Sequence, residues 1–237
     1  MSEATETKSK IISTGNPEID KKLGGGIPVG SLAFVEGAAD SGKSVLVQQL
    51  IWGSLRNGCR VTLLTTENTV KSFIKQTDSL SLNVLDYCLL SRLKVYPIKA
   101  TKVKSRPGKA LEALTRAVYA QRGRELVVID SLTAFVSQSS TEEALAFFEE
   151  CKDFCNTEMT IVTVFHTYAF DMSFLVRIGA LCDAHLRLTT ENVGTKLVKV
   201  LEVCKIRGAG KSTGNVVSFD VEPGWGMRII PFTKANV

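Results

Sequence analysis

The sequence predicts an α/β fold with a mostly parallel central sheet flanked by helices and antiparallel strands at its C-terminal end. Three observations support this fold class. Short runs rich in Val, Ile and Leu alternate with segments of helical period, which is typical of βαβ units. A glycine-rich loop lies between one such run and the helical segment that follows it. After Cys182 strand-like runs follow one another directly.

The first strands and helices lie between residues 31 and 76. The run SLAFVEG at 31–37 predicts a buried strand, and RVTLLTTE at 60–67 predicts a second. The segment between them, from Lys43 to Asn57, has a helical period and is closed by Gly58. TVKSFIKQ at 69–76 predicts the next helix.

The alternation continues through the middle of the chain. Helices are predicted near Lys109 to Gln121 and near Glu142 to Cys155, with strands ELVVID at 125–130 and MTIVTVFH at 159–166. The stretch from Ser140 to Glu143 has the residues of a capping box, in which each side chain satisfies a backbone N–H at the helix start.

Three strand-like runs follow: AHLRLTTEN (184–192), TKLVKVLEVCKI (195–206) and NVVSFDVEPG (215–224). They are separated by Gly194 and by RGAGKSTG (207–214), so they predict antiparallel hairpins that complete the sheet. No internal repeat or interdomain linker is visible. We therefore predict a flexible polar tail at 1–10 and a single domain over residues 11–237.

The composition indicates a soluble, cytoplasmic protein. Of the 237 residues, 44% are hydrophobic, yet no apolar run approaches the eighteen residues of a membrane span, and MSEATETKSK at the start is unlike a signal peptide. Membrane contact is expected only through partners. The six cysteines include no C-x-x-C pair and only two histidines are present, so a zinc site is not expected and the cysteines are expected to be reduced.

The charges are unevenly distributed along the chain. Residues 125–176 contain nine acids and one base, Lys152. Residues 92–124 contain one acid, Glu112, and ten bases: Arg92, Lys94, Lys99, Lys102, Lys104, Arg106, Lys109, Arg116, Arg122 and Arg124. This basic segment is interpreted as a solvated face, a site for an acidic partner or an attachment to anionic lipid, and we favour the partner. Its only aromatic residues, Tyr96 and Tyr119, are too few for a platform on which bases stack.

The loop from Gly37 to Ser44 matches G-x-x-x-x-G-K-[ST], the pattern of a phosphate-binding loop. Its glycines let backbone N–H groups and the helix N-terminus face phosphates, Lys43 reaches the β- and γ-phosphates, and Ser44 ligates Mg²⁺. The cofactors predicted are therefore ATP and Mg²⁺. The residues expected around the phosphates are Gly37, Ala38, Ala39, Asp40, Ser41, Gly42, Lys43, Ser44 and Val45.

Three further residues follow predicted strands and are candidates for the same site. Asp130 ends ELVVID and is expected to hold the magnesium ion through water. Glu67 follows the second strand, where it either positions the attacking water or interacts with a helix N-terminus. His166 ends MTIVTVFH, where it either senses the γ-phosphate or is simply exposed.

The order of GIPVGSLAFVEG, the phosphate loop, TTEN, VVIDS and KIRG resembles the KaiC branch of the RecA superfamily from about residue 11 to 232. The resemblance implies a RecA-like P-loop NTPase fold with Glu67 as the catalytic glutamate. Asn68 stands where these proteins often have a second acid, which argues against efficient hydrolysis. KIRG implies that Lys205 and Arg207 reach the γ-phosphate of an adjacent subunit in a homo-oligomer, expected to be a hexameric ring; a solvated hairpin tip is the alternative.

Three other segments resemble a narrower family. STGNPEIDKKLGGGIP, HTYAFDMSFLVRIGALCDAHLRL and VEPGWGMRIIP are similar to the FlaH (ArlH) family of accessory ATP-binding proteins of the archaellum, the archaeal flagellum used for motility. This resemblance implies a cytoplasmic ring component at the archaellum base that binds ATP, hydrolyses it poorly or not at all, and docks to the motor ATPase FlaI and other motor-base components.

Two other functions are weighed against this one. A RecA-type ATPase acting on DNA would need basic loops, but residues 167–173 contain no Lys or Arg and include Asp171, so nucleic acid is not expected as a partner. A KaiC-like autokinase is the second alternative, since Thr65, Thr66 and Ser131 lie near the expected γ-phosphate; strand and turn chemistry is their simpler role.

Overall fold

The structure, a computed structural model, describes residues 11–99, 101, 109–193, 196–210 and 215–230. Within them a nine-stranded sheet has the order β11-β10-β9-β8-β3-β7-β6-β4-β5, beside a small sheet of β1 and β2. The strands are β1 (Ile11–Ile12), β2 (Ile27–Pro28), β3 (Leu32–Gly37), β4 (Val61–Thr65), β5 (Leu93–Pro97), β6 (Leu126–Asp130), β7 (Thr160–His166), β8 (Ala184–Val193), β9 (Lys196–Ile206), β10 (Val216–Glu222) and β11 (Gly226–Ile229). The helices are α1 (Pro17–Lys22), α2 (Lys43–Arg56), α3 (Val70–Ser79), α4 (Leu85–Leu89), α6 (Ala110–Tyr119), α7 (Thr133–Val136), α8 (Thr141–Cys155) and α9 (Met172–Leu181), with a 3₁₀ turn η1 (Thr167–Ala169).

The strands from β8 to β5 run parallel to one another, and their C-terminal ends form one edge of the sheet. The register aligns Gly37 of β3 with His166 of β7, and Thr65 of β4 with Asp130 of β6. Ligands of open α/β sheets bind outside the carboxyl ends of the strands. We call this the phosphate edge, and the opposite edge, where β4, β5 and β6 begin, the arginine edge.

The remaining strands are antiparallel. β8 pairs with β9, β9 with β10, and β10 with β11, each in antiparallel register. The predicted C-terminal hairpins are therefore confirmed. Their turns at 194–195 and 211–214 lie outside the described residues, as does the predicted polar tail.

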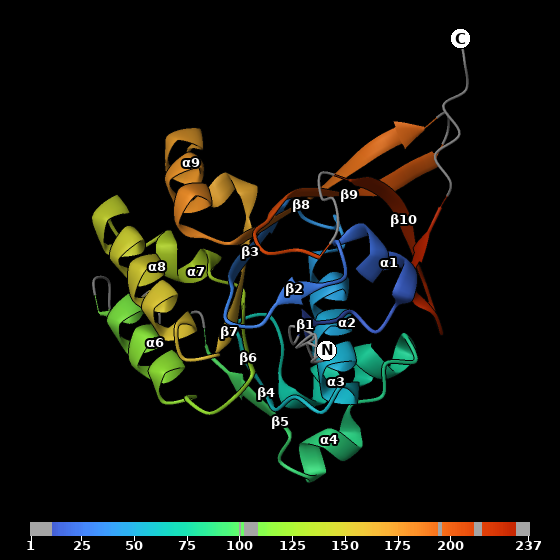
Figure 1. Cartoon of the computed structure of the whole chain (residues 1–237), viewed down its shortest axis with the longest axis horizontal. Helices are drawn as coiled ribbons and strands as arrows, with labels where there is room; N and C mark the ends of the chain where they lie inside the picture. Colours follow the sequence, from blue (N-terminus) through green and yellow to red (C-terminus); the bar gives the residue numbers. More distant parts are fainter. Residues whose placement is uncertain (1–10, 100, 102–108, 194–195, 211–214, 231–237) are drawn as a thin grey trace, which may run out of the picture.

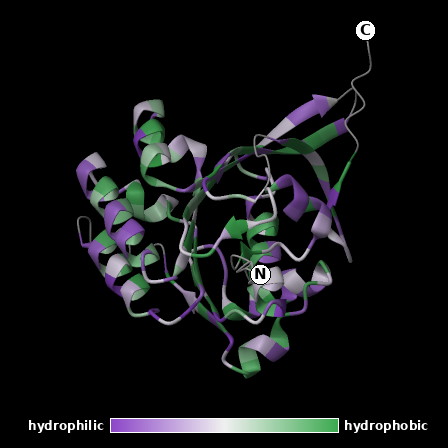
Figure 2. Cartoon of the chain, viewed as in Figure 1, coloured by the Kyte–Doolittle hydropathy of each residue, from purple (hydrophilic) through white to green (hydrophobic). Residues whose placement is uncertain are grey.

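Helices cover both faces of the sheet. Figure 1 shows α1, α2 and α3 on one side, and α6, α8 and α9 in a row on the other. The alternation of β3 explains this layering: Ala33 and Val35 join the core around α2, whereas Leu32 and Phe34 join the core around α8. Figure 2 shows the strands largely hydrophobic and the outer helices of mixed character, as expected for a buried sheet.

Polar caps fix where several helices begin. Asn16 accepts hydrogen bonds from the first turn of α1, and Thr69 caps α3. The predicted capping box of α8 is confirmed: Ser140 Oγ accepts from Glu143 N, and Glu143 Oε2 accepts from Ser140 N. Among the described residues, no helix is long and apolar enough to cross a membrane.

Two elements that matter for the surface of the protein, β5 and α9, were not predicted. β5 lies in the basic segment and is an edge strand with a single neighbour, β4, and only Leu93 of its five residues is buried. α9 lies in a stretch that has apolar residues on both its faces, and this hides its helical period. The formation of β5 and α9 therefore depends more on the elements that pack beside them than on the hydrophobic pattern of their own residues.

Candidate functional site

A cavity of about 460 Å³ opens at the phosphate edge of the sheet. Its walls come from the predicted loop, from the ends of three parallel strands and from two antiparallel strands. The lining residues are Ala39, Asp40, Ser41, Gly42, Lys43, Ser44, Val45, Glu67, Asp130, Ser131, His166, Lys199 and Val221. Gly37 and Ala38 are not among them, and their carbonyl groups instead accept hydrogen bonds from Lys43.

The backbone of the loop has the geometry of an anion cradle. Asp40 and Gly42 have positive φ values of 57° and 95°, which turns successive N–H groups toward one side. Gly42 is also the N-cap of α2, and no side chain caps that helix. The free N–H groups of the first turn therefore face the cavity with the positive end of the helix dipole.

Close packing requires the two glycines of the motif. A Cβ atom at Gly37 would lie 2.4 Å from Leu188 O, and one at Gly42 would lie 2.8 Å from the Phe219 ring. Leu188 lies on β8, which pairs with β3, and Phe219 lies on β10, one of the antiparallel strands. The loop thus packs against residues about 150 to 180 positions away, which the local motif does not indicate.

Lys43 is buried and folds back over the loop. Its Nζ donates to Gly37 O at 3.0 Å and to Ala38 O, and it lies 3.5 Å from His166 Nδ1. Burial lowers the pKa of Lys43, and this effect is opposed by the nearby carboxylates of Asp130 and Glu67. A buried cation whose bonds go to loop carbonyls can exchange one of them for a phosphate oxygen.

Asp130 lies at the end of β6 and is 5% exposed. Burial raises its pKa to about 7, with a further contribution from Glu67 that Lys43 opposes. A carboxylate held in such a place costs free energy unless a cation compensates it. This environment suits a residue that helps to hold a divalent ion.

Glu67 follows β4 and is exposed at the cavity wall. Its Oε1 accepts a hydrogen bond from Ser131 Oγ at 3.1 Å. The neighbouring Asn68 turns away, because its Oδ1 accepts from Ser72 Oγ in the first turn of α3. Glu67, the one acid of the TTEN segment, therefore lines the cavity, and Asn68 does not.

The three hydroxyl groups considered for autophosphorylation all take part in local hydrogen bonds. Thr65 Oγ1 accepts from the N–H groups of Glu67 and Asn68. Thr66 Oγ1 donates to Ser131 O at 3.2 Å and accepts from Ser131 N. The Thr65 bonds fix the turn after β4, and the Thr66–Ser131 bonds join the ends of β4 and β6, so these hydroxyl groups have structural roles.

His166 reaches the cavity wall from the end of β7. Burial lowers its pKa, and the positive charge of Lys43 lowers it further. The imidazole ring stacks on the ring of Tyr168, with 5.2 Å between centroids. His166 is therefore a neutral polar group beside Lys43 and is connected to the turn before α9.

Two lining residues, Lys199 and Val221, were not foreseen. They belong to β9 and β10. Lys199 lies close to the loop: its Cδ atom is 3.4 Å from the position that a Cβ atom at Gly42 would occupy. No local pattern marks them. They lie there because β8, β9 and β10 extend the sheet from β3 in that order, so only strand order could have indicated them.

Lys205 and Arg207 are not brought to the cavity of their own chain. Lys205 pairs with His185 near the start of β8, whereas the loop begins at the level of Leu188. The separation along the strand is about 10 Å or more at 3.3 Å per residue. Lys205 Nζ donates instead to Gly179 O, and Arg207 Nη2 donates to Ala180 O at 3.2 Å.

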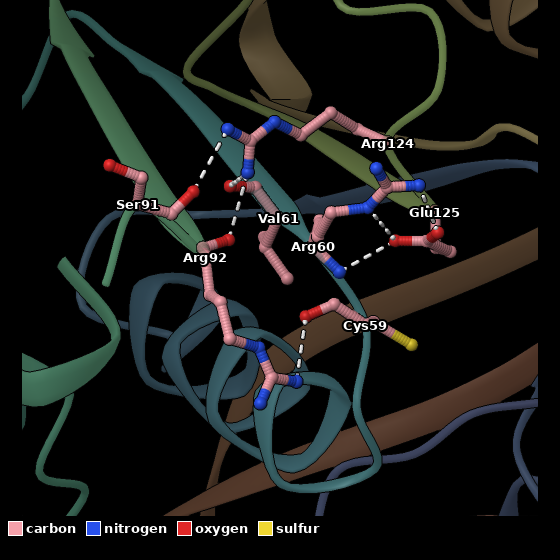
Figure 3. A network of polar contacts seen from close by, with 7 residues as sticks. All are labelled: Cys59, Arg60, Val61, Ser91, Arg92, Arg124 and Glu125. Carbon is pink, nitrogen blue, oxygen red and sulfur yellow. Dashed lines mark hydrogen bonds and ion pairs between the residues drawn. The ribbon is translucent and has the colours of Figure 1, made fainter.

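Two cations of the basic segment, Arg92 and Arg124, form hydrogen bonds with backbone carbonyl groups inside the protein, so they are not available to an acidic partner (Figure 3). Arg124 donates to the carbonyl groups of Val61, Ser91 and Arg92, and Arg92 donates to those of Leu55 and Cys59. These two arginines join β4, β5 and α2 at the arginine edge. Lys102, Lys104 and Arg106 lie outside the described residues.

The residues of the cavity fit a magnesium nucleotide. The uncapped N-terminus of α2, the buried Lys43 and the wide cavity suit a polyphosphate. Ser44 and Asp130 line the same cavity and offer a hydroxyl and a carboxylate oxygen, the donors that Mg²⁺ prefers. Among the described residues, no group of three or more His, Cys, Asp or Glu side chains could hold another metal ion.

Comparison with known proteins decides the family. A family model described as "ATPase: KaiC" matches residues 12–234. The archaeal flagellar ATP-binding protein FlaH of Sulfolobus acidocaldarius is 31% identical over 228 residues, which cover 95% of this chain and 99% of that protein. The chain belongs to the KaiC-like ATPase family and is a homologue of FlaH.

Solved structures of the KaiC-like family agree with this assignment. The crystal structure of flagellar accessory protein FlaH from Methanocaldococcus jannaschii has a TM-score of 0.82 and 27% identity, covering 94% of this chain and all of that one. A KaiC-like protein from Pyrococcus horikoshii shares the fold with a TM-score of 0.73 at 16% identity, covering 94% of this chain and all of that one. The predicted RecA-like fold is confirmed.

Proposed function

We propose that this chain is an ATP-binding regulatory or scaffolding component of the archaellum motor. In this proposal ATP occupancy gates assembly of a ring, on the cytoplasmic side of the membrane, and its docking to the motor ATPase FlaI. Hydrolysis is weak or absent. One observation carries the proposal: a fully formed phosphate-loop cavity lies in a chain that is similar, over 95% of its length, to a protein named for ATP binding in the archaeal flagellum.

Binding of the triphosphate uses groups that the isolated chain leaves available. The free N–H groups at the start of α2 donate to phosphate oxygens, and Lys43 exchanges its bonds to loop carbonyls for bonds to the β- and γ-phosphates. Ser44 would hold Mg²⁺ with its hydroxyl group, and the carboxylate of Asp130 would help to hold the ion. The cation would supply positive charge that compensates the phosphates and the carboxylate of Asp130.

The arrangement of the acids supports weak hydrolysis. Glu67 is the single acid of its segment at the cavity, and it is exposed and held by Ser131. A general base must be free to accept a proton from water. An exposed carboxylate that already accepts a hydrogen bond is a poor candidate for that work.

The position of Lys205 and Arg207 supports assembly. They lie well back along the sheet from their own phosphate loop, which supports a role at the phosphate site of another copy. Two cations supplied by a neighbour stabilise phosphate charge and link ATP occupancy to assembly. ATP then acts on the equilibrium between separate and assembled chains.

The test is a paired assay on the purified protein. Binding of a fluorescent ATP analogue and release of phosphate are measured for wild type, Glu67→Ala and Glu67→Gln. Tight binding with phosphate release near background in all three proteins supports the proposal. Several turnovers per minute in wild type, lost in both variants, would show that the chain is an active ATPase and would overturn the regulatory function.

A further inference from the structure

Trp225 is an exposed tryptophan in the tight turn that joins β10 to β11. Its side chain is 76% exposed, and no aromatic ring or cation from the described part of the chain lies against it. The turn belongs to VEPGWGMRIIP, a segment to which the proposed function assigns no role. An indole ring is a large, flat and mostly apolar surface, and such rings contribute strongly to binding when a ligand covers them.

The fold fixes the place of this turn. Gly224 N donates at 2.9 Å to Ser79 O, at the end of α3. Trp225 N donates at 3.1 Å to Glu222 O. Gly224 and Gly226 have φ values of 79° and 73°, in the left-handed region that favours glycine. A side chain whose backbone is already held loses less conformational entropy when it binds a ligand.

The nucleotide cavity extends toward this turn along β10. One wall of the cavity contains Lys43, Asp130 and His166, and the proposed function places the terminal phosphates and Mg²⁺ there. A second wall, from β9 and β10, contains Lys199 and Val221. Because the phosphates lie at one end of a nucleotide, the nucleoside at its other end is left the second wall. The apolar residue of that wall is Val221.

Trp225 lies within reach of a base at the second wall. Val221 pairs with Met227 across the ladder of β10 and β11, and Trp225 comes two residues before Met227. Paired residues are about 5 Å apart and two residues along a strand span about 6 Å, so the Cα atoms of Trp225 and Val221 are about 8 Å apart. No Phe, Tyr or Trp among the described residues lines the cavity itself. A base beside Val221 therefore finds no ring to stack on within the cavity, and the Trp225 indole is near enough to cover it.

We propose that Trp225 stacks on the base of the bound nucleotide and sets the preference of the site for purine nucleotides. This inference rests on the proposed function, which supplies the nucleotide. Another strongly exposed aromatic side chain, Tyr168, stacks on His166 at the phosphate wall and is at the wrong end of the cavity for this role. A purine covers more of an indole ring than a pyrimidine does, so the stack favours ATP over CTP. Every base has a π face, and the preference is therefore one of degree.

The experiment measures binding by calorimetry for wild type, Trp225→Ala, Trp225→Phe and a matched control, Tyr96→Ala. Tyr96 is 41% exposed on β5, at the opposite edge of the sheet from β10 and β11. The ligands are MgATP, MgCTP and magnesium tripolyphosphate, which has the phosphates without a nucleoside. We expect Trp225→Ala to bind MgATP about tenfold more weakly, the loss typical of one base stack, and to bind tripolyphosphate as wild type does. Trp225→Phe should keep most of the affinity for MgATP, and Trp225→Ala should discriminate less between MgATP and MgCTP.

Tryptophan fluorescence provides a second measurement. The chain has two tryptophans, and the other, Trp52, lies under the Arg56 guanidinium on α2. MgATP should change the emission of wild type, whereas tripolyphosphate should not. The change should be lost in Trp225→Phe, which keeps Trp52.

Four results would overturn the inference and leave the proposed function intact. They are wild-type affinity of Trp225→Ala for MgATP, an equal loss of tripolyphosphate affinity in that variant, an equal loss of MgATP affinity in the Tyr96→Ala control, and an unchanged emission response in Trp225→Phe. A wild type that binds neither MgATP nor tripolyphosphate would overturn the proposed function, and the inference with it.

Discussion

The phosphate edge and the arginine edge of one sheet treat their polar groups in opposite ways. At the phosphate edge, Asp130 is a buried carboxylate beside the uncapped start of α2, and the nearby cation, Lys43, is bonded to loop carbonyls. At the arginine edge, Arg92 and Arg124 donate to five carbonyl groups, and Arg60 forms an ion pair with Glu125 at 2.8 Å (Figure 3). One edge is available for a ligand and the other is complete.

The difference indicates that the phosphate edge lowers the free energy of unfolding, whereas the arginine edge raises it. A buried charge without a full set of partners costs free energy, whereas a charged donor that satisfies several carbonyl groups contributes it. Substitutions at the phosphate edge should therefore change binding strongly and can stabilise the free protein. Substitutions at the arginine edge should lower stability and leave the intrinsic affinity for ATP unchanged.

The largest effect is expected for Lys43→Ala. The substitution removes two charge-assisted bonds to phosphate, each contributing about 1.5–3 kcal/mol, so ATP affinity should fall at least 100-fold. Equilibrium binding of a fluorescent ATP analogue measures the loss. The free protein should also lose some stability, because there Lys43 Nζ donates to Gly37 O and Ala38 O. An affinity within threefold of wild type would contradict the assigned site.

The next largest effect is expected at the arginine edge, for Arg124→Ala. Three carbonyl groups lose a charged donor, and a loss of about 3 kcal/mol in the free energy of unfolding should lower the melting temperature by roughly 6–12 °C. The matched control is Arg122→Ala, since that guanidinium lies over the Tyr119 ring and joins no strands. Calorimetry of the two variants should separate them clearly, and equal melting temperatures would refute the stabilising role of Arg124.

A smaller effect of opposite sign is expected for Asp130→Asn. The folded pKa of about 7 lies above the ordinary value of 3.8, so the folded protein binds more protons than the unfolded one between these two values. The stability contributed by this group therefore falls as pH rises from about 4 to 7. Removing the charge should stabilise the free protein at pH 8 by about 2 kcal/mol. Each pKa unit between the folded and unfolded values corresponds to about 1.4 kcal/mol of unfolding free energy, and relaxation of the protein around the charge reduces the full difference.

Chemical denaturation at pH 5 and pH 8 checks this prediction. The gain in stability from Asp130→Asn should be several times larger at pH 8 than at pH 5. MgATP should reduce the gain, because a cation near Asp130 compensates the charge in wild type only. A gain that is the same at both pH values would mean that Asp130 is not the group that titrates.

The parts of the site that could be predicted from sequence share one property. Gly37 to Ser44, Glu67, Asp130 and His166 all lie at the C-terminal ends of strands that the alternating pattern already indicated. In a parallel sheet such ends always meet at one edge. Recognition of the strands was therefore enough to bring these residues together, without knowledge of strand order.

Other features depend on contacts between distant parts of the chain. Arg92 and Arg124 look like part of a basic patch, and only the pairing of β4 with β5 and β6 shows the carbonyl groups that they satisfy. Lys199 looks like one lysine among several in a strand, and only the order β9, β8, β3 brings it beside the phosphate loop. The register of β9 on β8 takes Lys205, and Arg207 beyond it, away from that loop.

The sequence by itself determined the fold class, the phosphate loop and the strand ends around it, because these depend on local period, local glycines and a rule that holds for every parallel sheet. Tertiary structure alone decided which cations serve the cavity and which hold the opposite edge together. The physical reason is that the role of a charged side chain is not defined until its neighbours are known. A lysine or arginine binds whichever carbonyl, carboxylate or phosphate the packed chain places within about 3 Å of it.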